Sequence, residues 1–296
     1  MLNYEEFVRT ITEIAEARTG NHAVVHKVKK VNGFYEDGLV IINPDCNISP
    51  TIYLRPYYEL YKEMMDTEDE PVELVWNEIY SLYRNNMPVA DFDLNDFRNY
   101  ESIKEKLGIR IVNYFKNIEL LDELVFVEFM DLAILFIVNV SMGKEVGAIT
   151  IRKEHLALWG KTEEELMEQA LVNIKDDYEI VPITEMLMRI AGEIELEKDI
   201  DLPIYVMSNY SKVNGASTIL CRGVLKEFAE KHNVSKVVII PSSLHEVLLM
   251  PWNEDADIEY LNSMVQEVNE TVLDAREILS EHVYVYNNVT EKIDMC

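Results

Sequence analysis

Four apolar segments between residues 109 and 151 constrain the fold of this chain most, because they follow one another as strands. They span residues 109–114, 124–130, 132–140 and 148–151. Each has the length and apolar content of a buried strand. A doubly wound sheet requires strict alternation of strands and helices, which this order lacks. The sequence therefore predicts an α+β fold with a mixed or antiparallel sheet.

The remaining periodicities predict helices packed around that sheet. Helical spacing covers residues 3–18, 56–65, 72–83, 95–107, 152–175, 182–191, 224–231 and 255–279. Further strands are expected at 23–31, 39–42, 47–54, 203–207, 236–240 and 283–286, and Asn32-Gly33 supplies the positive-φ residues of a hairpin turn. We expect a smaller N-terminal α+β subdomain over residues 1–90 and a main α+β domain over 91–296, with one compact unit as the alternative.

The longest apolar stretch, residues 124–140, does not predict a membrane span. Glu128, Asp131 and Asn139 interrupt it, and it is shorter than the roughly 20 residues that a spanning helix needs. The first residues also lack the basic and apolar regions of a signal peptide. These features predict a cytoplasmic protein without membrane association.

The charge of the chain limits its partners. It has 54 acidic and 27 basic residues, a net charge of −27, which disfavours direct binding to nucleic acid or anionic membrane. Three interpretations of this charge remain: a highly soluble protein, a binder of a basic protein partner, and an acidic nucleic-acid mimic. The third rests on carboxylates that alternate with apolar residues and would line one face if extended; a solvated edge strand or loop is the plainer interpretation. These acids are Glu193, Glu195, Glu197, Asp199 and Asp201.

Cysteine and histidine are too scattered to predict a metal site or a disulfide framework. Cys46, Cys221 and Cys296 form no CxxC pair, and His22 and His26 lack an evident third ligand. Cys221 lies beside Arg222, which would lower its pKa, although a buried inert thiol is the plainer expectation. We predict no metal and no cofactor.

The segment after the strand at 236–240 holds the best candidate catalytic residues: Ser242, Ser243, His245 and Glu246. The spacing of Ser243 and Glu246 is typical of a capping box at a helix start; a strand–turn–strand bent at Pro241 is the alternative. A Ser–His–Glu hydrolase is a third interpretation, but triad members normally converge from distant segments. A zinc-protease motif would require a second His at position 249, which is Leu.

Two further motifs have structural explanations. Gly160-Lys161-Thr162 resembles the end of a phosphate-binding loop, but position 155 is His rather than Gly, and Thr162 with Glu165 forms a better capping box. Turn chemistry explains the polar loop at 209–217. If it faces the Pro-Ser-Ser segment across neighbouring strand ends, its candidate binding residues are Asn209, Asn214, Gly215 and Ser217.

Several of these segments together resemble an uncharacterised family, a domain of unknown function. They include His155-Leu-Ala-Leu-Trp-Gly160, Asn214-Gly-Ala216, Pro241-Ser-Ser-Leu-His-Glu-Val247 and Leu279-Ser-Glu-His-Val-Tyr284. The resemblance covers nearly the whole chain. It implies a shared fold and a bacterial origin, in gut-dwelling Firmicutes and often beside mobile-element genes. It implies no catalytic residue.

The function of the chain is therefore not determined by its sequence. The favoured hypothesis is a non-enzymatic cytosolic binding or regulatory protein of a bacterial or mobile-element context. A hydrolase-like enzyme that uses Ser242, Ser243, His245 and Glu246 is one alternative, and an acidic nucleic-acid mimic is another.

Overall fold

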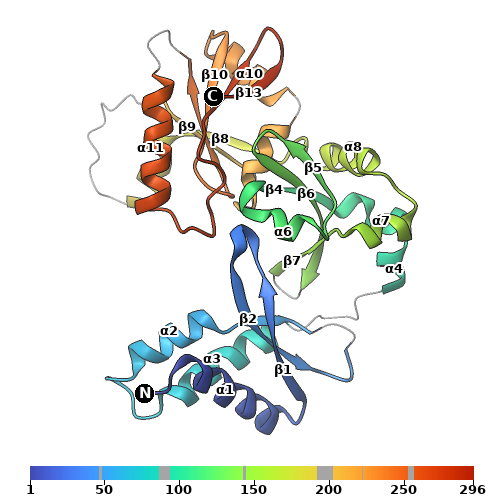
Figure 1. The fold of residues 1–296 in the computed structure, drawn as a ribbon, viewed down its shortest axis with the longest axis vertical. Helices are drawn as coiled ribbons and strands as arrows, with labels where there is room; N and C mark the ends of the chain where they lie inside the picture. The colour runs from blue at the N-terminus through green and yellow to red at the C-terminus, as the bar shows by residue number, and fades with distance from the viewer. Residues whose placement is uncertain (47–48, 87–93, 143–144, 192–202, 222, 253–256) are drawn as a thin grey trace. The chain divides into compact units, whose positions relative to one another are not determined.

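The structure is a computed structural model (Figure 1) that describes residues 1–46, 49–86, 94–142, 145–191, 203–221, 223–252 and 257–296. The chain forms two compact units. The first comprises residues 1–97 and 139–149, and the second comprises 98–138 and 150–296. Whether residues 1–90 and 91–296 are separate domains stays a prediction.

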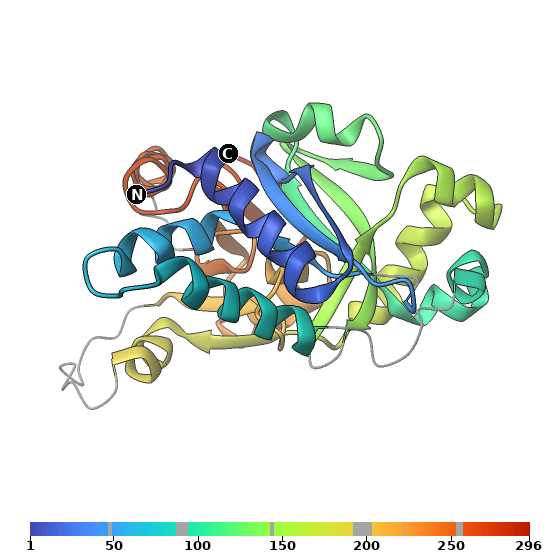
Figure 2. The same cartoon turned by 90° about the horizontal axis from the view of Figure 1, so that it is seen from below.

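The first unit packs three helices against a small antiparallel sheet. The sheet order is β1-β2-β3. Figure 2 shows the three helices lying together, and their shared core includes Phe7, Leu39 and Trp76. The elements are α1 (Tyr4–Thr19), β1 (His22–Lys29), β2 (Tyr35–Ile42), β3 (Thr51–Tyr53), α2 (Arg55–Met64) and α3 (Pro71–Asn85).

Local chemistry fixes both ends of α1 and the hairpin that follows. Asn3 and Glu6 form a reciprocal capping box with two 2.9 Å hydrogen bonds. Gly20 ends the helix with a φ of 71°, a conformation that favours glycine. Asn32 and Gly33 have φ values of 59° and 75°, which confirms the predicted positive-φ turn, here a 3-10 turn, η1 (Val31–Gly33).

A four-stranded antiparallel sheet is built around β6 (Leu132–Met142), which pairs with the other three strands. Those are β4 (Leu107–Asn113), β5 (Phe126–Phe129) and β7 (Glu145–Thr150). The four apolar segments between residues 109 and 151 correspond to these four strands, so the prediction that they form successive strands is confirmed. Helix α8 (Glu163–Ile174) packs against β4.

The second sheet is antiparallel and has the order β13-β12-β10-β11-β9-β8. Its register separates two faces: Ile239, Leu249 and Tyr205 pair in a row on one face, and Val238 and Met250 lie on the other. Helix α11 (Ile258–Thr271) packs on the Val238 face. Helix α10 (Val224–Lys231) packs on the Tyr205 face, since Phe228 meets Tyr205 at 5.2 Å between ring centroids. The strands are β8 (Glu179–Pro182), β9 (Tyr205–Ser208), β10 (Lys236–Pro241), β11 (Val247–Pro251), β12 (Tyr284–Asn287) and β13 (Lys292–Met295).

A buried polar network joins the two sheets of the second unit. Asp131, in the turn between β5 and β6, accepts hydrogen bonds from Tyr284 Oη at 2.6 Å and Ser280 Oγ at 2.7 Å. Both Asp131 and Tyr284 are buried. Asn269 of α11 donates to the Ser280 carbonyl at 2.9 Å. A buried carboxylate is tolerated when such donors replace its water, so this network fixes the segment that enters β12.

The α+β prediction is confirmed and the sheets are antiparallel, but three predicted helices are shorter or broken. The segment at 95–107 divides because Asn99 is extended and caps a second short helix. The segment at 152–175 divides at Gly160, whose φ is 61°. The segment at 255–279 is helical only in α11. The remaining elements are α4 (Leu94–Arg98), α5 (Tyr100–Ile103), η2 (Lys104–Lys106), η3 (Phe115–Asn117), α6 (Ile118–Leu121), α7 (Lys153–Trp159), α9 (Ile183–Ala191) and η4 (Gly215–Leu220).

Two further expectations can be compared with the structure. Thr162 and Glu165 form the predicted capping box of α8, with the Thr162 N–H donating to Glu165 Oε2 at 2.9 Å. Within the described residues no helix has both the length and the apolar content that a bilayer span requires.

Candidate functional site

The Pro-Ser-Ser segment forms the turn of a hairpin. Residues 242–246 connect β10 to β11, and Pro241 pairs with Val247. Ser243 Oγ accepts from the His245 N–H at 3.0 Å, and the Ser243 N–H donates to the Glu246 carbonyl at 3.1 Å. The capping-box prediction is wrong here, because a second strand rather than a helix follows. The strand–turn–strand alternative describes the segment.

This turn is anchored by the polar loop at 209–217, so the two candidate segments do lie together. Asn214 donates its backbone N–H to His245 Nδ1 at 3.2 Å, and Ser208 Oγ donates to the His245 carbonyl at 2.7 Å. Gly215 lies so close that an added Cβ would collide with Ser208 Oγ and the His245 carbonyl oxygen. Only glycine allows this approach.

The side chains of the turn are arranged as structural partners. Ser242 Oγ lies 3.4 Å from Glu246 Oε1, and His245 Nε2 lies 3.8 Å from Glu277 Oε1. Neither serine hydroxyl bonds an imidazole among the described residues, although a nucleophile and its base normally share such a bond. The loop residues are used similarly: Asn209 Nδ2 donates to the Val213 carbonyl and Ser217 Oγ to the Asn214 carbonyl, both at 2.9 Å.

The other candidate residues of the sequence are mostly outside any shared site. Cys221 is buried and donates to the Ile174 carbonyl at 3.3 Å, and burial, followed by the charges of Asp177 and Asp176, raises its thiol pKa to about 12. The burial that the inert-thiol expectation requires is therefore confirmed, and the low reactivity of the thiol stays a prediction. In the described part of the chain no three His, Cys, Asp or Glu side chains are grouped as metal ligands would be. Glu193, Glu195, Glu197, Asp199 and Asp201 lie outside the described residues.

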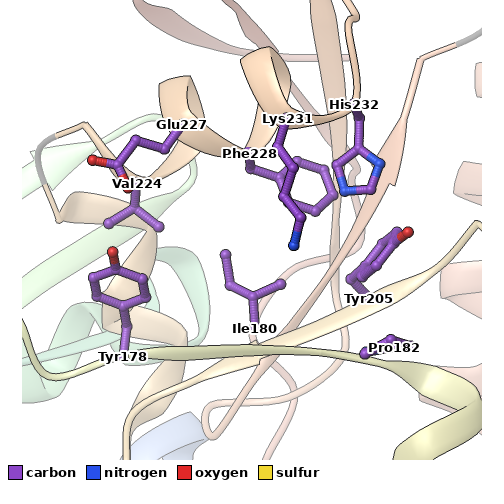
Figure 3. A pocket seen from close by; sticks show the side chains of 9 residues that line it. All are labelled: Tyr178, Ile180, Pro182, Tyr205, Val224, Glu227, Phe228, Lys231 and His232. Atoms are coloured by element: carbon purple, nitrogen blue, oxygen red, sulfur yellow. The ribbon is translucent and has the colours of Figure 1, made fainter.

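A pocket of about 180 Å³ lies between α10 and the β8–β9 edge of the six-stranded sheet. Ile180 and Pro182 of β8 form its floor together with Tyr178, which precedes the strand, because Pro182 pairs with Tyr205 and so shares the α10 face. Figure 3 shows Tyr178 and Tyr205 at its two sides and the α10 side chains above it. The residues from α10 and its C-terminal end are Val224, Glu227, Phe228, Lys231 and His232.

The walls of this pocket are aromatic. The His232 ring lies 4.7 Å from Tyr205 and 4.4 Å from Phe228 between centroids, in tilted arrangements. Together with Tyr178 they surround the aliphatic Ile180. Such rings offer a flat apolar ligand both contact area and favourable edge or face geometry.

Two opposite charges line the pocket without neutralising each other. Glu227 and Lys231 lie four residues apart on α10, the spacing and order that favour an ion pair. No ion pair joins them in the described part of the chain. Figure 3 shows Lys231 pointing toward Ile180, whereas Glu227 points to the side where Tyr178 lies. Both residues are exposed, so the ammonium group lies at the solvent side of an otherwise apolar pocket.

Two titratable rings of the pocket, His232 and Tyr178, are held in their neutral forms. Burial, followed by the charge of Lys231, lowers the pKa of His232. Burial, followed by the charge of Glu227, raises the pKa of Tyr178. The other ionisable side chains on α10 that line the pocket are Lys231 and Glu227.

Our sequence analysis did not identify this pocket. The alternation Tyr178-x-Ile180-x-Pro182 is a strand signal, but residues 182–191 were assigned to a helix and 178–181 to no element. The lining also comes from three separate segments, which only the β8–β9 pairing brings together. A local pattern cannot predict that pairing.

Comparisons with known proteins identify a family but no activity. One family model matches residues 4–288, and its description is a family of unknown function, DUF5688. The match confirms the resemblance to an uncharacterised family. No curated protein and no solved structure matches the chain.

Proposed function

The chain belongs to DUF5688, a family of unknown function, and on that premise we propose that it is a non-enzymatic binding protein. Its ligand site is the pocket between α10 and the β8–β9 edge. The ligand is a carboxylate attached to a small flat or branched apolar group. The observation that carries this proposal is Lys231, an exposed residue that lines the aromatic pocket and has no ion pair with Glu227 in the described part of the chain.

The size and chemistry of the pocket support this ligand class. Pockets for drug-sized ligands occupy about 300–1,000 Å³, so about 180 Å³ suits a small acid or the end of a larger molecule. A carboxylate would pair with Lys231, and its apolar part would contact Tyr205, Phe228 and Ile180. A charge-assisted hydrogen bond contributes about 1.5–3 kcal/mol, so its loss should weaken binding by at least about tenfold.

Binding of 3-phenylpropionate, measured by calorimetry, tests the proposal. We expect wild-type protein to bind it and to bind neither 3-phenylpropionamide nor phenethylamine. Lys231→Met, which keeps the length of the side chain but removes its charge, should weaken binding at least about tenfold. Lys226→Met is the matched control, because Lys226 lies on the same helix and pairs with Glu291 at 2.5 Å instead of lining the pocket.

A second arm identifies the source of the carboxylate. An acetylated tripeptide that ends in Phe carries a C-terminal carboxylate, and its amidated form does not. Tighter binding of the acid tripeptide than of 3-phenylpropionate would indicate a protein C-terminus, and the reverse would indicate a free small acid. The pocket is not a carboxylate site if the amides bind as tightly as the acids. The same conclusion follows if Lys226→Met and Lys231→Met weaken the binding of 3-phenylpropionate equally.

The wider setting belongs to the same proposal. A cytoplasmic protein of bacterial or mobile-element context, with a basic protein as a partner, accords with the net charge of −27. A hydrolase that uses Ser242, Ser243, His245 and Glu246 is the alternative, and the hydrogen bonds of the turn give it little support. Binding by Asn209, Asn214, Gly215 and Ser217 and mimicry of nucleic acid by the acids at 193–201 stay predictions.

A further inference from the structure

Helix α11 has an exposed apolar ridge on the face of the sheet opposite the pocket. Tyr260, Met264 and Val268 of this helix and Val272, its C-terminal cap residue, follow one another at intervals of four, and these residues are 62, 43, 43 and 78% exposed. The same helix buries Val265 and Asn269 against the unit. Single exposed apolar residues are ordinary, but four in one i, i+4 row form the type of ridge that packs into another helix.

The charge beside the ridge defines the partner. The neighbouring row, one position earlier, contains Glu259, Ser263, Glu267 and Thr271, and Glu270 is also exposed. Helix α11 contains no Lys or Arg. A helix that buried the ridge would therefore place its flanking residues beside uncompensated carboxylates, which favours Lys and Arg and disfavours Asp and Glu.

We propose that the α11 apolar ridge docks an amphipathic helix of a partner protein, whose apolar i, i+4 row is flanked by Lys and Arg. The mode is packing of one helix on another, with apolar anchors one turn apart. The ridge supplies burial and the acidic row selects the sign of the partner's charge. The basic partner rests on the proposed binding function, but the ridge and the pocket lie on opposite faces of the sheet, so either can fail alone.

A synthetic amphipathic helix of Leu and Lys is the probe, and the same helix with Glu in place of Lys is its control. Protein labelled with ¹³C at the methionine methyls reports the contact, and the Met264 signal is assigned by its absence from Met264→Leu. We expect the Leu–Lys helix to shift the Met264 signal and the Leu–Glu helix to leave it unchanged. Binding should weaken in about 0.5 M NaCl, where charges are screened beyond a few ångströms.

Substitutions separate docking on the ridge from general attraction to an acidic protein. The double variant Met264→Asn and Val268→Asn should bind the Leu–Lys helix at least about tenfold more weakly. Val172→Asn is the matched control, because Val172 is 59% exposed on α8, and it should bind as wild type does. Met264→Leu should also bind as wild type does.

Three outcomes would overturn the proposal. The first is equal binding of the Leu–Lys helix to wild type and to the ridge variant, or no binding to either. The second is equal binding of the Leu–Glu helix. The third is a wild-type dimer in sedimentation that becomes a monomer in the ridge variant, because the occupant would then be a second copy of this chain. Failure of 3-phenylpropionate to bind would leave these measurements unaffected.

Discussion

Ser242 and Ser243 are neighbours in the sequence, yet their hydroxyl groups have different roles in the turn. Ser243 is buried, and its oxygen accepts a backbone N–H within the turn at 3.0 Å. Ser242 is only half-buried, and its nearest partner, a Glu246 oxygen, lies 3.4 Å away. A buried donor that loses its acceptor destabilises the fold more than a weak partly solvated contact does.

Ser243→Ala should therefore lower the free energy of unfolding by about 1–2 kcal/mol. Ser242→Ala, the matched control, should change it by less than about 0.5 kcal/mol. Urea unfolding followed by circular dichroism measures both. Equal effects of the two substitutions would contradict the assigned role of the Ser243 hydroxyl.

His232 should make stability depend on pH. Its pKa is lowered in the folded protein, first by burial and then by Lys231, so the unfolded chain binds a proton more readily. The stability is present above the ordinary value of about 6.5 and is lost as the pH falls from there through the folded pKa. We expect His232→Phe, which keeps the ring packing, to lose less stability than wild type between pH 7 and pH 5.

The same substitution has a consequence at neutral pH. His232 Nε2 is buried without a hydrogen-bond partner among the described residues, and Phe removes that atom. Urea unfolding at a series of pH values measures both effects, with His26→Gln on the exposed side of β1 as the control. Parallel pH profiles for wild type and His232→Phe would show that the imidazole does not contribute.

At the scale of elements, the Asp131 network is the principal polar connection between the two sheets of the second unit that we describe. Tyr284 donates to Asp131 from β12, and burial, followed by the charge of Asp131, raises the pKa of this phenol. The phenol therefore keeps its proton over the whole range in which the protein would be studied. Without the Tyr284 hydroxyl, a buried oxygen of the Asp131 carboxylate would lose its hydrogen-bond donor.

Tyr284→Phe should thus lower the free energy of unfolding by about 1–3 kcal/mol. Tyr286→Phe is the control on the same strand: Tyr286 is also buried, and its hydroxyl makes no hydrogen bond that we observe in the described residues. It should change stability by less than about 0.5 kcal/mol. Thermal and urea unfolding compare the two variants. A cost for Tyr286→Phe as large as that for Tyr284→Phe would contradict the proposed role of the network.

Elements whose signals are local could be predicted from the sequence. Helix α10 was expected at its observed residues, 224–231, and the capping boxes of Asn3 and Thr162 mark observed helix starts. The strand β11 was not predicted, because the spacing of Ser243 and Glu246 favoured a helix start before it. The strands β8 and β13 were not predicted either; they are the two edges of the six-stranded sheet, and each depends on a single neighbour for its pairing.

The same contrast between local signals and tertiary pairing applies to the candidate site. For the loop at 209–217, turn chemistry and a position facing the Pro-Ser-Ser turn were both open, and the hydrogen bond from Asn214 to His245 shows that the two segments meet. The pocket was missed, since Ile180, Tyr205 and Phe228 belong to three elements. Their proximity results from tertiary pairing, which propensity and period do not encode.

At the scale of the whole molecule, charge opposes folding. The ion pairs are on the surface, for example Arg18–Glu73 at 2.9 Å and Lys161–Glu165 at 2.7 Å, and such pairs contribute about 0–1 kcal/mol each. The excess of acidic residues, 54 against 27 basic ones, repels itself in the compact state. Salt weakens both the stabilising ion pairs and the destabilising repulsion. Whether added salt raises or lowers the stability of the fold therefore shows which of the two is larger.

We expect added NaCl to raise the melting temperature. An increase to about 0.5 M reduces the screening length from about 10 Å to a few ångströms, and a gain of about 1 kcal/mol corresponds to roughly 2–4 °C for a chain of this size. Scanning calorimetry measures the shift, and KCl at the same ionic strength should give the same result. A melting temperature that falls with salt would mean that the ion pairs outweigh the repulsion.

The Asp131–Tyr284 bond also bears on how the protein is made. Its two ends are 153 residues apart, so a growing chain exposes Asp131 and the sheet around β6 long before the ribosome adds β12. Contacts this distant in sequence slow folding, because a long loop must close before they form. The second unit therefore completes its fold only after β12 has been synthesised, and until then it presents unpaired strand edges that chaperones would recognise.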